Sequence, residues 1–401
     1  MKIALGVRHF RPLGGAEHFV RKLAHYLVGQ GHEVSVYAIT GTPIDGVRLH
    51  LLPRPRWCPR YRRDWATGRL ISEALARSDA DVTFGEQKIW NANVVRPGGG
   101  VEATYWKYHL KRKWKSVWLA ERVAALCPKR RRDLRAERRS LLGPDVCSII
   151  VNSDLVRRDM VQHYPSVAAR VQVVHNGSDL VCCPDERKQR LRQDTERRFG
   201  LPENARLALF IGHDFYRKGL ESAILSLAKA QQKSPGQDWH LLVTGRGHIE
   251  PYQQVADKAG VGDRLHYMGE MKDAFQAYAS ADVLLFPSHY DPFANVTAEA
   301  ICYGVPVITT ADNGGCEIIR DGYNGWVVDS PMAIEAMSDH LVTLSNPAQL
   351  AAMKANAIES SRRCKMLDTL RSVEKILVDA AEIRTHRAAY VMPTPARAAI
   401  A

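Results

Sequence analysis

The chain has 401 residues, of which 45% are hydrophobic and 25% are charged, and its formal net charge is +13. Such a length exceeds what one hydrophobic core holds, so we expect two domains of a globular protein, and no apolar run is long enough to span a bilayer. The positive charge predicts an acidic partner: anionic lipid, a phosphorylated glycan or nucleic acid.

The first residues and the cysteines both favour a cytoplasmic protein. The segment Met1–Arg8 is expected to be a strand rather than a signal peptide, because Arg8 and His9 interrupt its apolar run and no small-residue cleavage site follows. The eight cysteines are scattered and form no C-x-x-C pair. This spacing argues against a zinc site or a disulfide framework and is typical of a reducing compartment.

Short apolar segments alternate with helical patterns along the chain, which predicts βαβ units and therefore parallel sheets with helices on both faces. In the first series we expect a helix over Ala16–Gln30 and strands at Lys2–Val7, Glu33–Ile39, Val47–Leu52, Asp81–Gly85, Ser148–Asn152 and Val171–His175. In the second we expect a helix over Lys218–Gln231 and strands at Leu207–Gly212, His240–Thr244, Leu265–Met268, Val283–Phe286, Val305–Thr309 and Trp326–Val328. Beyond Asp329 the pattern is helical to about Ile383.

These series predict an α/β protein with two tandem Rossmann-like, doubly wound domains facing a central cleft. We expect an N-terminal domain over residues 1–175, a charged linker over 176–204 and a C-terminal domain over 205–370. Residues 371–401 are expected to form a helix that packs back on the N-terminal domain, followed by a loose tail. In sheets of this kind ligands bind at the carboxyl ends of the strands.

Glycine and charged residues stand at several of these strand ends. Gly14-Gly15 follows the first strand, and Gly245 follows the second strand of the second series. Arg217 and Lys218 come shortly after Gly212, and two adjacent cations at such a loop can neutralise a diphosphate leaving group. Each feature alone is also common in ordinary turns and solvated loops, but their joint position at strand ends favours a ligand site.

The stretch from Asp291 to Glu299 has the most specific chemistry. It follows an apolar strand, turns at Asp291-Pro292 and enters a helix expected to begin near Ala294. The free N–H groups of a helix N-terminus bind anions, and the flanking carboxylates of Asp291 and Glu299 can accept hydrogen bonds from hydroxyl groups. A nucleotide sugar, with a diphosphate between two hydroxyl-bearing rings, needs this combination.

Together these motifs resemble glycosyltransferase family 4, which has the GT-B fold. The resemblance covers about residues 2–325, and within the family it is strongest to the lipopolysaccharide-core glucosyltransferase subfamily. The motifs that carry it are Gly14-Gly15-Ala16-Glu17, Val151-Asn152-Ser153, His175-Asn176-Gly177, Gly212-x4-Arg217-Lys218-Gly219, Asp291-x7-Glu299 and Gly304-Val305-Pro306-Val307-Ile308. The family pattern is Glu-x7-Glu, so Asp291 is one methylene shorter than the family residue. That departure leaves the donor sugar undefined.

The resemblance also implies roles for these residues. Arg217 and Lys218 would bind the donor diphosphate, and the backbone N–H groups of the helix start, at Asn295 and Val296, would contact its phosphates. Asp291 would accept hydrogen bonds from the donor sugar and Glu299 from the ribose. Transfer would retain the anomeric configuration, need no metal or other cofactor and use no protein nucleophile. Gly14, Gly15, Gly212 and Gly245 would line the donor side, and Glu17 and Glu102 the acceptor side.

A basic, aromatic segment spans residues 101–140, where thirteen Lys and Arg face four Asp and Glu for a net charge of +9. Aromatic and basic side chains that suit a membrane interface are Trp106, Lys111, Arg112, Lys113, Trp114, Lys115 and Trp118. A solvated helix with core-facing tryptophans is the alternative. Nucleic-acid binding would use a similar composition, but no recognised motif accompanies it.

The sequence therefore predicts a cytoplasmic enzyme, peripheral on the inner face of a bacterial membrane. It would transfer a hexose from a UDP-sugar to a lipid-linked, phosphorylated glycan, with the lipopolysaccharide core as the first expectation. A family 4 transferase acting on another lipid-linked or phosphoinositol glycan is one alternative. A non-catalytic membrane-binding scaffold is the other, and it would hydrolyse no UDP-sugar.

Overall fold

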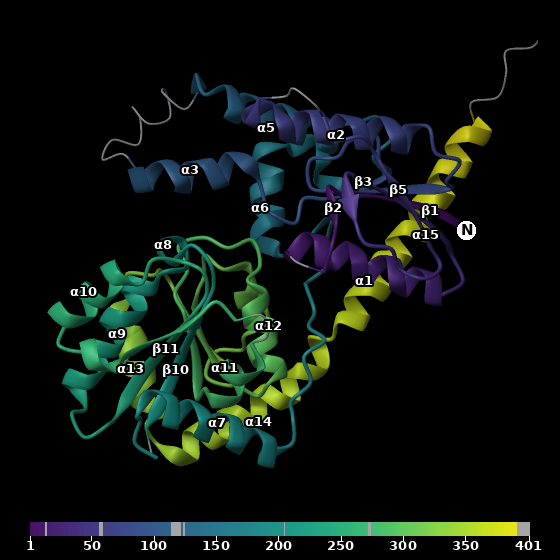
Figure 1. Cartoon of the computed structure of the whole chain (residues 1–401). Coiled ribbons are helices and arrows are strands. Elements are labelled where there is room, and N and C mark those ends of the chain that lie inside the picture. The colour runs from purple at the N-terminus through teal and green to yellow at the C-terminus, as the bar shows by residue number, and fades with distance from the viewer. Residues whose placement is uncertain are drawn as a thin grey trace, which may run out of the picture. The chain divides into compact units, whose positions relative to one another are not determined.

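The computed structural model describes residues 1–12, 14–55, 59–113, 122, 125–203, 205–271 and 274–390 (Figure 1). The chain divides into two compact α/β units, which confirms the predicted fold class. Unit 1 comprises Met1–Val151, Arg157–Val174 and the chain from Leu370 onward. Unit 2 comprises Asn152–Val156 and His175–Thr369.

Unit 1 is built on a parallel sheet of seven strands in the order β5-β3-β1-β6-β7-β8-β9. Its strands are β1 (Lys2–Gly6), β3 (Glu33–Ala38), β5 (Val47–Leu51), β6 (Val82–Glu86), β7 (Val94–Arg96), β8 (Ser148–Val151) and β9 (Val171–Val173), beside a short pair, β2 (His9–Phe10) and β4 (Thr40–Gly41). Its helices are α1 (Gly15–Gly29), α2 (Arg60–Ala76), α3 (Glu102–Lys113), α5 (Pro128–Leu141), most of α6 (Asp154–His163), η1 (Pro165–Arg170) and most of α15 (Met366–Tyr390).

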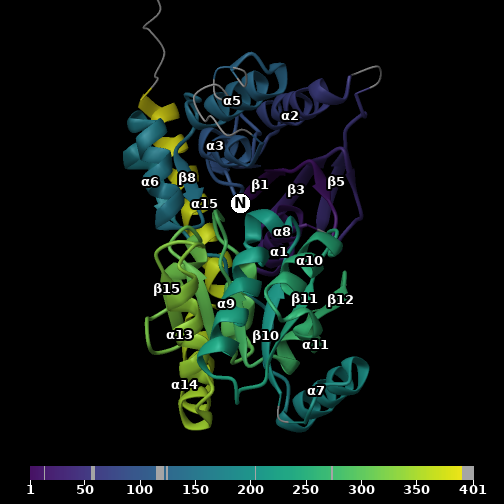
Figure 2. The same cartoon turned by 90° about the vertical axis from the view of Figure 1, so that its left-hand side faces the viewer.

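Unit 2 is built on a parallel sheet of six strands in the order β12-β11-β10-β13-β14-β15, of which β15, β10, β11 and β12 are labelled from left to right in Figure 2. They are β10 (Arg206–Ile211), β11 (Trp239–Thr244), β12 (Leu265–Gly269), β13 (Val283–Phe286), β14 (Val307–Thr310) and β15 (Gly325–Val328). The helices are α7 (Asp185–Phe199), α8 (Phe215–Lys218), α9 (Leu220–Lys233), α10 (Glu250–Lys258), η2 (Gly262–Arg264), α11 (Phe275–Ser280), α12 (Asn295–Cys302), η3 (Gly314–Ile318), α13 (Ile334–Leu344), α14 (Pro347–Ser360) and η4 (Ser361–Arg363).

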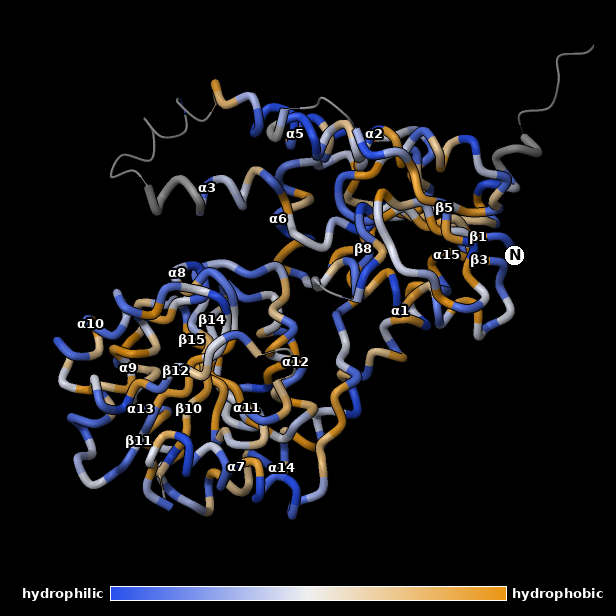
Figure 3. Tube along the Cα trace, in the orientation of Figure 1, coloured by the Kyte–Doolittle hydropathy of each residue, from blue (hydrophilic) through white to orange (hydrophobic). Residues whose placement is uncertain are grey.

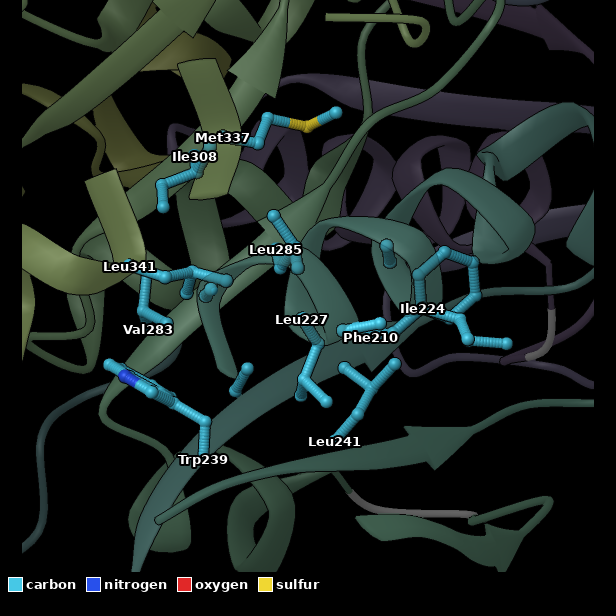
Figure 4. Close-up of a cluster of buried hydrophobic side chains, with 14 of the residues drawn as sticks. Phe210, Ile224, Leu227, Trp239, Leu241, Val283, Leu285, Ile308, Met337 and Leu341 are labelled. Atoms are coloured by element: carbon cyan, nitrogen blue, oxygen red, sulfur yellow. The ribbon is translucent and has the colours of Figure 1, made fainter. Parts of the chain in front are cut away.

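The strands of unit 2 are apolar on both faces because helices cover both. Along β10, Phe210 belongs to the core under α9 and α13, and its neighbour Leu209 belongs to the core under α11 and α12. Figure 4 shows the first of these cores, where Leu227 of α9 and Leu341 of α13 lie with Phe210 and other strand residues. Burial on both faces is what the continuous apolar strand runs predicted.

The segment 176–204, which the sequence indicated as a linker, lies in unit 2. Its helix α7 is strongly hydrophilic in Figure 3, yet it is held by a buried polar contact. Arg192 donates to the carbonyl of Ala205 at 2.6 Å and pairs with the carboxylate of Asp282 at 3.3 Å, and Asp282 is 2% exposed. Leu191 and Phe199 of the same helix also pack against the core of unit 2, so the segment has a charged composition but is part of that unit.

The C-terminal helix α15 leaves unit 2 after Thr369 and belongs to unit 1 from Leu370 onward. Its carboxylate at Glu374 accepts from the hydroxyl of Tyr26 at 2.6 Å and contacts the ring of His32 at 3.0 Å. Val373 and Leu377 are fully buried. Within the described residues, no helix is long and apolar enough to cross a membrane.

Candidate active site

The candidate site of unit 2 lies where the strand order reverses direction. Strands β10 and β13 are neighbours in the sheet, while the chain between them builds β11 and β12 on the far side of β10. In such sheets the usual ligand position is the crevice at the carboxyl ends of two strands of this kind. The loop after β10 carries Arg217 and Lys218, and the loop after β13 carries Asp291 and leads into α12.

The two loops meet in an ion cluster of Arg217, Lys218 and Asp291. The ammonium of Lys218 hydrogen-bonds to the carboxylate of Asp291, and Arg217 Nη1 lies 3.4 Å from the same oxygen. Arg217 Nη1 also donates to the carbonyl of Tyr290 at 2.9 Å. Arg217 Nε also lies 3.6 Å from the carboxylate of Asp214, so the two cations face two carboxylates and the cluster is formally neutral.

Lys218 is held in a poorly hydrated position. Its side chain is 13% exposed, and its ammonium lies 5.1 Å from the ring centroid of Phe286. Burial lowers the pKa of Lys218, Asp291 opposes that effect, and Arg217 adds to it. A buried ammonium needs a negative partner to stay charged, so the cluster couples this lysine to whatever anion occupies the crevice.

Tight backbone packing fixes the loops around the cluster. Gly219 has φ +81°, and a Cβ there would overlap with the carbonyl oxygen of Pro287. Gly245 has φ +141°, and a Cβ there would overlap with the carbonyl of Gly212. His213 extends this contact, since its Nδ1 accepts the N–H of Arg246 at 3.0 Å. Glycine is therefore required at 219 and 245 for the loops to approach each other.

The N-terminus of α12 is positioned by Asn313, which is fully buried. The side-chain oxygen of Asn313 accepts the N–H of Ala294 at 3.1 Å, just ahead of the first helical residues Asn295 and Val296. The loop before α12 is also joined to the segment that follows β14, because Gly314 N–H donates to the carbonyl of Asp291 at 2.8 Å. Asn295 is exposed and Val296 partly exposed, so the start of α12 is accessible to an anion.

Glu299 lies one helical turn further along α12 and is partly exposed. Its Oε2 accepts the hydroxyl of Tyr278 at 2.7 Å. Because residues three and four apart share a face of a helix, Glu299 stands on the same side as Asn295 and Val296. One helix thus presents backbone N–H groups and then a carboxylate in line.

In unit 1, the structure places the candidate glycines at the N-terminus of α1. Gly14 is the N-cap residue with φ +88°, Gly15 is the first helical residue, and Glu17 lies in the first turn. The carboxylate of Glu17 occupies the space that a Cβ on Gly14 would need. Glycine at 14 therefore provides both the backbone angle and the room for this side chain.

Glu102, expected on the acceptor side, belongs to an ion-pair network of unit 1. Its carboxylate lies 2.5 Å from the ammonium of Lys88, and its N–H donates to Glu137 at 2.8 Å. Glu137 also accepts the hydroxyl of Tyr164 at 2.8 Å, and burial raises its pKa to about 7. The contacts described for Glu102 thus hold the start of α3, and they leave its acceptor role a hypothesis.

The basic, aromatic segment is described in part. Trp106 is partly buried, and the ammonium of Lys129 on α5 lies 5.6 Å from its ring centroid, so this tryptophan contacts the neighbouring helix. The backbone of Lys111, Arg112 and Lys113 is helical, whereas Trp114, Lys115 and Trp118 lie outside the described residues. Arg131, Arg135 and Arg138 of α5 are exposed.

Residues 13–181 match the family described as Glycosyltransferase Family 4, and residues 192–360 match Glycosyl transferases group 1. The chain belongs to the family 4 glycosyltransferases. This transferase is 26% identical over 349 residues to the lipopolysaccharide glucosyltransferase WaaG of Escherichia coli K12, covering 85% of its own chain and 88% of the relative. It is 28% identical over 260 residues to the D-inositol 3-phosphate glycosyltransferase of Thermomonospora curvata, covering 61% of its own chain and 60% of the relative.

Solved structures agree with the GT-B fold. The crystal structure of WaaG matches with a TM-score of 0.74 at 23% identity, covering 94% of this transferase and 99% of that chain. The Anabaena protein Alr3699/HepE in complex with UDP-glucose matches with a TM-score of 0.67 at 17% identity, covering 94% and 100% of the two chains. The predicted fold is thereby confirmed.

Sequence reasoning missed the residues that support the site. Asn313 and Tyr278 have no motif of their own, and their hydrogen bonds connect elements far apart in the sequence. Glu317 was missed too: its carboxylate accepts the N–H groups of Asp154 and Leu155 at 2.9 Å and contacts His175 at 2.7 Å. Asn313 precedes Gly314-Gly315 just after a predicted strand, and an asparagine before glycines in a turn is the signal that could have indicated one of them. Among the described residues, no three His, Cys, Asp or Glu side chains are grouped to hold a metal ion.

Proposed function

We propose that this transferase moves a hexose from a UDP-sugar to a lipid-linked, phosphorylated bacterial glycan, with retention of configuration and without a metal. One observation carries the proposal: the Arg217–Lys218–Asp291 cluster joins the segments that follow the neighbouring strands β10 and β13, and the second of these segments leads into α12 with Glu299. A diphosphate fits between the cations and the helix N-terminus, with a hydroxyl-accepting carboxylate on each side. The complexes of HepE with UDP and UDP-glucose support the choice of donor.

In this mechanism the cations act on the leaving group. Arg217 and Lys218 would stabilise the negative charge that develops on the diphosphate as the bond from sugar C1 to phosphate oxygen breaks. The diphosphate would release Asp291 from part of its ion pairing, and its carboxylate would then accept hydrogen bonds from hydroxyl groups of the sugar. The acceptor oxygen would attack C1 from the face that the diphosphate leaves. Its proton would pass to an oxygen of the departing diphosphate, so no protein nucleophile is consumed.

The decisive experiment is a donor screen with the purified transferase. We expect one UDP-hexose to raise the melting temperature and to be slowly hydrolysed, since a ligand that binds only the folded state stabilises it in proportion to its occupancy. Transfer to a lipopolysaccharide-core acceptor is then measured against transfer to inositol 3-phosphate, the acceptor named for other relatives. Binding without any hydrolysis or transfer would instead support the non-catalytic scaffold.

We further propose that the basic segment of residues 101–140 holds the enzyme on the anionic inner face of the cytoplasmic membrane. Each Lys or Arg near such a surface contributes about 1 kcal/mol, and salt weakens the contribution. The protein should sediment with phosphatidylglycerol vesicles but not with phosphatidylcholine. Replacing Lys111, Arg112, Lys113 and Lys115 together by Gln should weaken this binding and leave UDP binding intact. Unchanged sedimentation of that variant would identify the segment as an ordinary solvated helix.

A further inference from the structure

The contact between Tyr278 and Glu299 joins the core of unit 2 to its accessible crevice. Tyr278 lies on α11, which precedes β13, and Glu299 lies on α12, which follows it. The tyrosine is 1% exposed and packs in the core on this face of the sheet, with its ring centroid 6.0 Å from that of Tyr303. Only its hydroxyl reaches out of the apolar surroundings, and it meets Glu299 Oε2 at 2.7 Å.

This geometry allows Tyr278 one chemical role, that of a hydrogen-bond donor. Burial raises the pKa of Tyr278 well above its ordinary value, and the neighbouring carboxylate of Glu299 raises it further. The hydroxyl therefore keeps its proton and cannot act as a base. The ring is fixed by packing, so the donated hydrogen bond holds one carboxylate oxygen of Glu299 in a set place.

A carboxylate held in this way still has acceptor capacity. It offers about four lone-pair sites on two oxygens, and the hydroxyl of Tyr278 donates to one of these oxygens, Oε2. Two adjacent hydroxyl groups can donate to one carboxylate together. The start of α12 lies one turn away, at the distance of about 5 Å that separates residues three to four apart along a helix. Phosphates at the helix start would therefore place the nearest sugar ring of a nucleotide beside Glu299.

We propose that Tyr278 is a positioning residue, whose hydrogen bond holds Glu299 in the place from which its carboxylate accepts the ribose hydroxyls expected at this position. The inference rests on the proposed function, because it assumes that a nucleoside diphosphate occupies the crevice. It adds a residue on α11, an element that contributes none of the charged groups of the site.

The test compares UDP with 2′,3′-dideoxy-UDP by calorimetric titration of the full chain. The wild type should bind UDP more tightly, and Tyr278→Phe should weaken UDP binding about five-fold, the effect of one hydrogen bond, while changing the dideoxy ligand little. Tyr303→Phe is the matched control. Tyr303 is also 1% exposed and lies in the same core, but its hydroxyl contacts the thiol of Cys183 at 3.1 Å, so its loss should affect both ligands alike.

A double-mutant cycle keeps the test independent of any loss of folding. In a Glu299→Ala background, the change from Tyr to Phe at 278 should no longer alter UDP affinity. An equal loss for both ligands in Tyr278→Phe would overturn the positioning role. If the wild type turned over a UDP-sugar yet bound the two nucleotides equally, the ribose assignment would be wrong and the proposed function would still hold. If the wild type bound no UDP at all, the ribose assignment and the proposed function would both be wrong.

Discussion

Replacing Asn313 by Asp tests whether the buried side chain of Asn313 positions the start of α12. The Asn313 side chain makes four hydrogen bonds in a fully buried position: it accepts the N–H groups of Ala294 and Gly315 at 3.1 and 2.9 Å, and donates to the hydroxyls of Thr297 and Thr309 at 3.0 Å each. Aspartate has nearly the same shape and keeps both acceptor contacts. It loses both donor contacts and introduces a charge.

The contacts of Thr309 determine how large the effect should be. Its hydroxyl donates to the carbonyl of Phe286 at 2.8 Å, so it can only accept from residue 313 and would face a carboxylate oxygen in the variant. The contact with Thr309 is lost, at about 1 kcal/mol, whereas the hydroxyl of Thr297 can turn to donate to the carboxylate; burying the new charge or its proton adds about 2 kcal/mol. We therefore expect Asn313→Asp to lower the free energy of unfolding by about 3 kcal/mol and the urea midpoint by about 1 M or more.

The decisive measurement is UDP affinity under conditions where the variant is still folded. Moving the helix start away from the phosphates should weaken UDP binding at least about ten-fold, beyond any change in folded fraction. Asn324→Asp is the matched control. Asn324 is 1% exposed and makes two local hydrogen bonds, to Arg320 N–H and the carbonyl of Ile318, away from α12. Equal losses of affinity in both variants would refute the positioning argument.

Three further predictions concern the charged groups. Lys218→Ala should lower kcat/KM by about two orders of magnitude, whereas the surface variant Lys229→Ala should retain activity; near wild-type turnover of the first would remove Lys218 from the mechanism. Activity should survive EDTA, and activity lost on chelation and restored by Mn²⁺ would point to metal-assisted chemistry. Burial raises the pKa of Glu86 from 4.5 to about 7, against the opposing charge of Arg96. The folded state therefore favours the protonated carboxyl, and the contribution of Glu86 to stability is complete below pH 4.5 and is lost as the pH rises through 7. The unfolding free energy of wild type relative to Glu86→Gln should thus fall by up to about 1.4 kcal/mol per pH unit between pH 5 and 7, and a flat difference in urea titrations would contradict this.

The fold could be predicted from the sequence because parallel strands buried on both faces are continuous apolar runs. Val283–Phe286 was predicted with its observed bounds for this reason. The strand β7 escaped prediction because Val94–Arg96 has only three residues and its last one, Arg96, is charged. Arg96 is nevertheless buried, since it lies 3.7 Å from the ring centroid of Phe19 and pairs with Glu86 at 3.2 Å. A charged residue at a strand end can be internal when its partners come from other elements, and spacing alone does not reveal those partners.

The candidate site follows the same pattern. The sequence indicated that glycine, cations and carboxylates stand at strand ends, and the structure brings Arg217, Lys218 and Asp291 together there. It did not indicate the hydrogen bonds that hold them, since Tyr278 and Asn313 are defined by contacts with Glu299 and Ala294 rather than by a motif. Their positions depend on how helices lie across the sheet, which local patterns do not determine.

The ion cluster gives a physical reason for a carboxylate at position 291. An ammonium as buried as that of Lys218 is costly without a negative partner, and Asp291 supplies that partner. A diphosphate brings more negative charge to the same cations than one carboxylate does, so it competes with Asp291 for them. The shorter aspartate reaches Lys218 and accepts the N–H of Phe293 at 3.2 Å, so release of the ammonium leaves its carboxylate tied to its own loop. In this cluster the same side chain can therefore pair with Lys218 and, once a diphosphate takes over that ammonium, face the sugar that arrives with it.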